Sequence, residues 1–187
     1  MGIFSSAEKI TQNKVIYSIN EDDKTADVIG NEEASDEVFI PKYIEHESQQ
    51  YIVKRILKGS FKNSETIKSI RMPPDSELIK IEKKSFANSS IESIIIPTWV
   101  SELEEGWCYC TPKLKLAQVM PHNLVYLYLD EKMIIGKSDK KSDIYNNLVF
   151  VNRNVKTIFI PSFITRIGSY AFADSTIEKI IIPPHVT

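Results

Sequence analysis

Apolar residues recur along this chain at a fixed spacing, in a motif that ends in proline. The motif I-x-x-I-x-I-P occupies Ile91–Pro97 and again Ile177–Pro183. Shifting the sequence by 86 residues lays Phe86–Val100 over Phe172–Val186, and ten of these fifteen positions are identical. Self-similarity of this density predicts a repeat protein, in which each unit buries its apolar face by stacking on its neighbours.

Looser copies of the motif lie elsewhere in the chain. They are Val155, Ile158, Ile160 and Pro161; Ile67, Ile70, Met72 and Pro73; Val38, Ile40 and Pro41; and, with one extra residue, Leu114, Ala117, Val119 and Pro121. After the proline the better copies place two apolar residues and then an aromatic. These are Ile164, Ile167 and Phe172; Leu78, Ile81 and Phe86; and Val100, Leu103 and Cys108, where cysteine takes the aromatic place. One more copy starts at Ile44 and resumes after a long loop, expected over Glu45–Gln50.

The spacing predicts a short strand in each repeat. Ile94 and Ile96 alternate with Ile95, so they point to the same face of a strand, and Pro97 ends the ladder because it lacks a backbone donor. The polar pairs Asn88-Ser89 and Asp174-Ser175 follow the aromatic residue and predict turns. Stacking such units about 4.8 Å apart makes a parallel sheet along one side of a solenoid.

Composition agrees with a strand-rich protein. The 187 residues include 28 Ile against 9 Leu and 7 Ala, and β-branched side chains favour strands over helices. This excess argues against a helical bundle.

Charge and hydropathy exclude further classes. The chain has 23 basic and 25 acidic residues, so it lacks the basic surface that a nucleic-acid-binding domain shows. The longest apolar run, Leu124–Leu129, is far shorter than the roughly 20 residues of a membrane helix. The N-terminus lacks the apolar core of a signal peptide. These features leave the compartment open and favour a cytoplasmic or a non-classically surface-associated protein.

The repeats carry a family resemblance. The pattern I-x-x-I-x-I-P-x-x-V-x-x-I-x-x-x-A-F, seen in Ile177–Val186 and Ile164–Phe172, resembles the BspA-like leucine-rich repeat family of bacterial and protist surface proteins. The resemblance implies a mostly β leucine-rich repeat solenoid, with short parallel strands on a concave face and loops or short helical turns on the convex side. It covers the chain from about Val15 onward. Because the shared residues are packing residues, it specifies the fold and leaves the partner open.

The spacing also predicts how the chain is divided. Residues 1–14 are expected to be an N-terminal lead-in and residues 15–123 leucine-rich repeats. Residues 124–154 interrupt the period and are expected to form an irregular repeat or an inserted hairpin. Repeats resume over 155–187, and the chain stops just after a strand motif. We therefore expect either a fragment of a longer array or an open C-terminal end that another molecule, such as a second copy, covers.

A candidate ligand-binding surface follows from the strand alternation. If the motif isoleucines face inward, the residues between them face outward on the concave side of the sheet. These outward residues are Phe39, Ser69, Arg71, Ser93, Ile95, Thr157, Phe159, Lys179 and Ile181. Contiguous exposed apolar side chains tend to mark an interaction site. The alternative is that a loop or the irregular segment folds over them and makes them core.

Patterns that could carry catalysis are weak. Gly136-Lys137-Ser138 resembles the end of a phosphate-binding loop, but residue 131 is Glu where that motif needs glycine. The histidines His46, His122 and His185 have no metal-ligand spacing, and Cys108 and Cys110 are too close for a mutual disulfide. We therefore expect no enzyme, no cofactor and no metal site.

The first residues match one modification pattern. Met1-Gly2-Ile3-Phe4-Ser5-Ser6 fits the rule for N-myristoylation at Gly2. A single myristoyl chain gives only reversible membrane binding, and no basic cluster nearby supplies a second anchor.

The sequence predicts a non-catalytic recognition or adhesion module that binds a protein or a cell-surface ligand through its sheet face. The alternative is a structural scaffold or assembly subunit that associates through its open C-terminal end, with a second copy of itself as one such partner.

Overall fold

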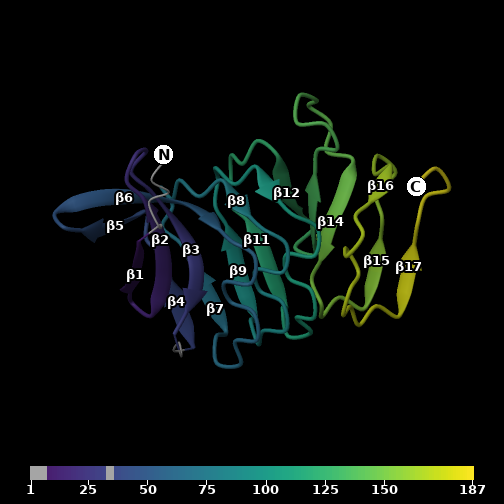
Figure 1. The fold of residues 1–187 in the computed structure, drawn as a ribbon. Coiled ribbons are helices and arrows are strands. Elements are labelled where there is room, and N and C mark those ends of the chain that lie inside the picture. The colour runs from purple at the N-terminus through teal and green to yellow at the C-terminus, as the bar shows by residue number, and fades with distance from the viewer. Residues whose placement is uncertain (1–7, 33–35) are drawn as a thin grey trace, which may run out of the picture.

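A computed structural model describes residues 8–32 and 36–187 (Figure 1). Its regular elements over these residues are short β-strands, most of which pair with a strand of the next repeat. The prediction of a mostly β solenoid with short parallel strands is confirmed.

One side of the molecule is a four-stranded parallel sheet in the order β11-β9-β7-β4. Its strands are β4 (Glu37–Phe39), β7 (Ser69–Arg71), β9 (Ser93–Ile96) and β11 (Leu116–Val119). Each strand begins inside a copy of the isoleucine motif. The first residue after the strand is the motif proline in β9, and it is the residue before that proline in β4, β7 and β11. Farther along the chain the same motif forms a separate two-stranded parallel sheet, β15 (Thr157–Phe159) and β17 (Lys179–Ile181).

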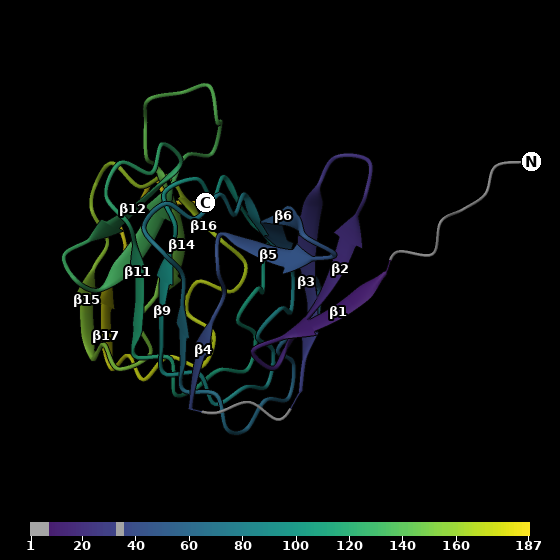
Figure 2. The same cartoon turned by 90° about the vertical axis from the view of Figure 1, so that its left-hand side faces the viewer.

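The opposite side is a seven-stranded sheet in the order β1-β2-β3-β6-β8-β10, with β5 paired to β6. Its strands are β1 (Lys9–Gln12), β2 (Val15–Asn20), β3 (Thr25–Asn31), β5 (Tyr43–His46), β6 (Gln49–Ile56), β8 (Lys80–Ile81) and β10 (Glu102–Leu103). Figure 2 shows this sheet and the four-stranded sheet on opposite sides, with the chain crossing between them. The segments after Pro41, Pro73 and Pro97 therefore each contain a second strand, β5, β8 and β10.

A third sheet contains the segment that breaks the period. Its order is β12-β13-β14-β16, with strands β12 (Tyr126–Leu129), β13 (Met133–Gly136), β14 (Asn147–Val151) and β16 (Arg166–Ile167). β12, β13 and β14 pair antiparallel, whereas β14 pairs parallel with β16. Two antiparallel strand pairs thus lie between the repeats on either side.

The polar corners form the expected turns. Asn63, Asn88 and Asp174 all have positive φ, between 56° and 62°, a conformation that Asn and Asp tolerate better than most residues. Asn88 Nδ2 also donates to Asn63 Oδ1 at 3.2 Å, so adjacent corners are linked. The turn prediction is confirmed at these positions.

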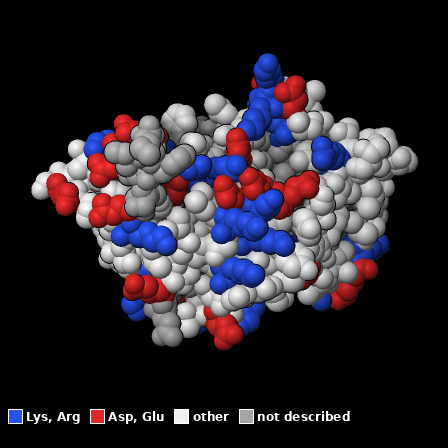
Figure 3. All heavy atoms as spheres, viewed as in Figure 1, with Lys and Arg blue, Asp and Glu red and all other residues white. Residues whose placement is uncertain are grey.

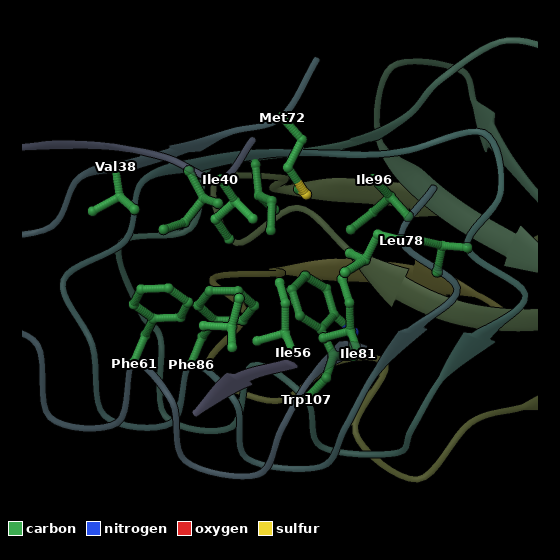
Figure 4. Close-up of a cluster of buried hydrophobic side chains, with 14 of the residues drawn as sticks. Val38, Ile40, Ile56, Phe61, Met72, Leu78, Ile81, Phe86, Ile96 and Trp107 are labelled. Atoms are coloured by element: carbon green, nitrogen blue, oxygen red, sulfur yellow. The ribbon is translucent and has the colours of Figure 1, made fainter. Parts of the chain in front are cut away.

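The core fills the space between the sheets. The motif isoleucines Ile70, Ile94 and Ile96 meet the buried Ile56 and Ile81 of the opposite sheet in one cluster, part of which Figure 4 shows. A second cluster contains Ile158, Ile160 and Ile164 of the later repeats. Burial of these branched side chains is the main force that holds the stack together.

Two expectations were wrong. Glu45–Gln50 is not a long loop, because β5 and β6 form an antiparallel hairpin with Glu47 and Ser48 at its tip, both at positive φ. Ile180 and Ile182 were expected to point into the core, but they are exposed because no described rung packs beyond β17.

Candidate functional site

Register brings the outward residues of the four-stranded sheet into rows. Ser69 of β7 pairs with Glu37 of β4 and with Ser93 of β9. In the next row Phe39 pairs with Arg71. Because every pair is parallel and unshifted, equivalent residues of successive repeats stand side by side on one surface.

The alternation along each strand decides which side chains reach this surface. Val38, Ile70 and Ile94 are buried, whereas their neighbours Phe39 and Ile95 are exposed. The predicted outward residues of these strands therefore do point out of the core. Together with those of β15 and β17 they form what we call the sheet face.

Four of the predicted residues line one hollow. Ser69, Arg71, Ser93 and Ile95 surround a depression of about 350 Å³ over β7 and β9, and Leu116 of β11 closes its far side. Arg71 Nε donates to Glu37 Oε2 at 3.0 Å, so the arginine is held at the rim of the hollow by an exposed ion pair. The hollow offers an apolar wall, two hydroxyl groups and one cation.

Four more of the predicted residues lie on the two-stranded sheet. Thr157 pairs with Lys179 and Phe159 with Ile181. The Phe159 ring is 59% exposed, more than any other phenylalanine among the described residues, and Ile181 beside it is also exposed. These two side chains make a second apolar patch.

The two parts of the sheet face do not pair as one sheet. Ala117 N in β11 donates to Asn152 Oδ1 at 3.0 Å, and Arg153 N donates to Leu114 O at 3.1 Å. The segment after β14 thus occupies the position next to β11. It leaves Ile95 and Phe159 exposed, so the irregular segment does not cover the predicted residues.

Comparison with known protein families identifies the repeats. The BspA type leucine rich repeat region matches residues 32–128 and 131–187 in six copies. The chain belongs to this family. Repeats of this family are generally protein-binding modules and are typically non-catalytic, and no enzyme family was found.

One solved structure supports the leucine-rich repeat fold, and others are similar to the chain at lower TM-scores. A leucine-rich repeat protein from Eubacterium ventriosum superposes with a TM-score of 0.56 at 14% identity, covering 96% of this chain and 61% of its own. A leucine rich cell surface protein from Faecalibacterium prausnitzii gives 0.47 at 12% identity, covering 98% and 78%. The pneumococcal vaccine antigen PcpA gives 0.41 at 14% identity, covering 96% and 65%. The chain thus spans less than two thirds of PcpA and of the E. ventriosum protein. A comparison with curated proteins gave no match.

The outer face of the seven-stranded sheet differs in chemistry from the sheet face. Arg55 pairs with Asp27, and Lys80 pairs with Glu104 at 2.6 Å and with Glu102 at 3.4 Å. Figure 3 shows Lys, Arg, Asp and Glu gathered on this side of the molecule. These charges satisfy one another and stay hydrated, so they offer a partner little unpaired charge.

The described residues hold no cluster of His, Cys, Asp or Glu that could bind a metal ion. No helix within residues 8–32 and 36–187 has the length and apolar character needed to cross a bilayer.

Cys108 is buried, and burial raises the pKa of its thiol to about 12, which makes it a poor nucleophile. Gly2 lies outside the described residues.

Sequence reasoning missed the contribution of β11. Leu116 and Gln118 extend the two rows, because they pair with Ser93 and Ile95. The extra residue in the Leu114–Pro121 copy shifts the motif spacing, so the spacing alone does not assign these two residues to the rows. The signal that could have found them is Ala117, which pairs with Ile94 and is buried like it.

Proposed function

We propose that the chain is a non-catalytic recognition or adhesion module that binds a protein or a cell-surface ligand through the sheet face. The observation that carries the proposal is the contrast between the two sides of the solenoid. The sheet face exposes Phe39, Ile95, Phe159 and Ile181, whereas ion pairs such as Arg55–Asp27 and Lys80–Glu104 lie on the opposite face. Exposed aromatic side chains and an arginine are enriched in protein-binding surfaces.

The test uses one pair of matched substitutions. Ile95 and Ile79 are 41% and 43% exposed, but Ile95 lies on the sheet face and Ile79 lies beside β8. We expect Ile95→Lys to abolish capture of partners from a native lysate, as should Phe159→Ser, whereas Ile79→Lys retains them. The captured proteins are compared by mass spectrometry.

The same variants need a stability control. Because both side chains are already solvated, Ile95→Lys and Phe159→Ser should leave the far-UV circular dichroism and the Tm nearly unchanged. Equal capture by all variants would contradict the proposal, and a large fall in Tm would show that the residue belongs to the core.

A second candidate function is assembly through the C-terminal rung. Ile180 and Ile182 of this rung are 38% and 46% exposed, whereas the equivalent Ile94 and Ile96 are 1% and 0% exposed. An apolar end with an unpaired strand edge favours association with another copy. Light scattering over a concentration series should then show an oligomer that Ile182→Lys dissociates. A monomer at every concentration would remove this candidate.

A further inference from the structure

A second hollow lies away from the sheet face, on the turns that follow Pro97 and Pro121. It encloses about 600 Å³, within the range of small-molecule sites. Apolar side chains line one part of it and charged side chains the other. These are Trp99, Val100, Leu124 and Val125, and Lys137, Lys140 and Asp143.

The apolar part is exposed but rigidly supported. Trp99 and Leu124 are among the most exposed large hydrophobic residues described. The turns that carry them are joined by the buried Asn123, whose Nδ2 donates to Pro97 O at 3.0 Å and to Val100 O at 2.8 Å. Its Oδ1 accepts from the backbone N of Val125 and Tyr126. With every polar atom of this amide bonded, the two turns stay in place and the hollow exists before any ligand binds.

The charged part contains an ammonium group whose positive charge is only weakly balanced by nearby negative charge. The Lys137 side chain is only 10% exposed, and its Nζ lies 5.1 Å from the centre of the Tyr145 ring. Its carboxylate partner is Asp143, at 3.7 Å, on a fully exposed side chain. A long ion pair to a solvated carboxylate contributes little free energy, whereas removing an ammonium group from water costs much. Lys140 at the rim adds a second cation, although it also contacts Glu102 at 3.2 Å.

We propose that this hollow binds small apolar carboxylates. The apolar body of the ligand packs on Trp99 and Leu124, and its carboxylate replaces Asp143 as the partner of Lys137. The ligand thereby covers exposed apolar surface and supplies the buried cation with a close anion. This site is separate from the sheet face, so it does not depend on the proposed function.

Trp99 itself can report binding. The chain has two tryptophans, and Trp107 is buried in the core, so a ligand in this hollow should change chiefly the emission of Trp99. We expect 4-phenylbutyrate to give a saturable blue shift, and 4-phenylbutanol and 4-phenylbutylamine to bind more weakly. Acid that binds no better than the alcohol, or no saturable shift at millimolar ligand, would overturn the proposal.

Variants separate the charge from the apolar contact. Lys137→Met keeps the length of the side chain and removes the ammonium, so the affinity for the acid should fall about tenfold or more and that for the alcohol should not change. Trp99→Ala should weaken both ligands, measured by calorimetry because the reporter is lost. Lys132→Met, at an exposed lysine outside the hollow, is the matched control and should leave both affinities unchanged.

A melting curve for each variant checks the fold. If Lys137→Met keeps the Tm and still binds the acid as tightly as the original protein, Lys137 is not the anion partner and the proposal fails. If Lys137→Met unfolds, Lys137→Gln replaces it in the same comparison, with the same result expected.

Discussion

Replacing Phe86 with alanine is expected to lower the free energy of unfolding by about 3–5 kcal/mol, the usual cost of removing a fully buried aromatic side chain. Phe86 is wholly buried and stands in the middle of a row of rings. Its centroid lies 5.3 Å from that of Phe61, with nearly parallel planes, and 5.9 Å from Trp107, edge to face. Figure 4 shows the three rings in a row inside the solenoid.

The size of this effect follows from the repeat architecture. Each aromatic comes from a different repeat, so Phe86 is the contact through which two neighbouring units hold each other. An alanine would leave a cavity that two well-ordered rings cannot close, and the loss adds to that of the ring's own buried surface.

Urea unfolding followed by circular dichroism measures the change. Phe163→Ala is the control, because this phenylalanine is exposed on the turn after Pro161 and should change stability by no more than about 0.5 kcal/mol. Similar values for the two variants would mean that the row of rings does not couple the repeats.

Replacing Arg153 with methionine is expected to act in the opposite direction and to raise the free energy of unfolding by about 1–3 kcal/mol. Arg153 is only 1% exposed, and a guanidinium group carries a full positive charge. Within the described part of the chain its Nε has no hydrogen-bond partner, and no carboxylate forms an ion pair with it. Such a charge is costly to bury.

The contacts around Arg153 compensate this cost only in part. Its Nη1 lies 3.4 Å from Ala171 O and 3.5 Å from Val151 O, both long for hydrogen bonds. Cys108 Sγ lies 3.7 Å from Nη2 and stays a neutral thiol, because burial raises its pKa to about 12. The guanidinium also lies 4.4 Å from the centre of the Phe150 ring, a cation–π contact that methionine would replace with a sulfur–aromatic one.

Two further substitutions test this interpretation of Arg153. Arg166→Met changes an exposed arginine and should be nearly neutral, so it controls for the loss of charge alone. Arg153→Lys keeps the charge, shortens its reach to the carbonyls and should destabilise. If Arg153→Met were less stable than the original protein, the long contacts would contribute more free energy than burial of the charge costs.

Local pattern carries much of the fold in a repeat protein. The alternation around Ile94 and Ile96 was enough to predict which side of β9 is buried, and the same phase assigned Phe159 and Ile181 to the outside. Asn88-Ser89 predicted its turn because an asparagine at positive φ is a local preference. Each inference used only residues within one repeat, where sequence distance and spatial distance agree.

Features that depend on how the repeats meet could not be read in this way. The hairpin of β5 and β6 resembles a loop in sequence, because its pairing is set by the neighbouring strands of the seven-stranded sheet. In the sequence, Lys137 belongs only to an incomplete phosphate-binding motif. Lys137 lines a hollow together with Trp99 and Leu124, whose turns lie elsewhere in the chain.

The sequence by itself therefore determined the strand period, the buried and outward faces of β4, β7, β9 and β15, and the family. Only the tertiary structure decided that residues after β14 separate the two parts of that face, that Arg153 is buried without a carboxylate, and that Trp99 shares a hollow with Lys137. The physical reason is that burial along a strand follows from the direction of each side chain, which local geometry sets. Cavities and unpaired charges arise where segments distant in sequence come together, and no local pattern encodes them.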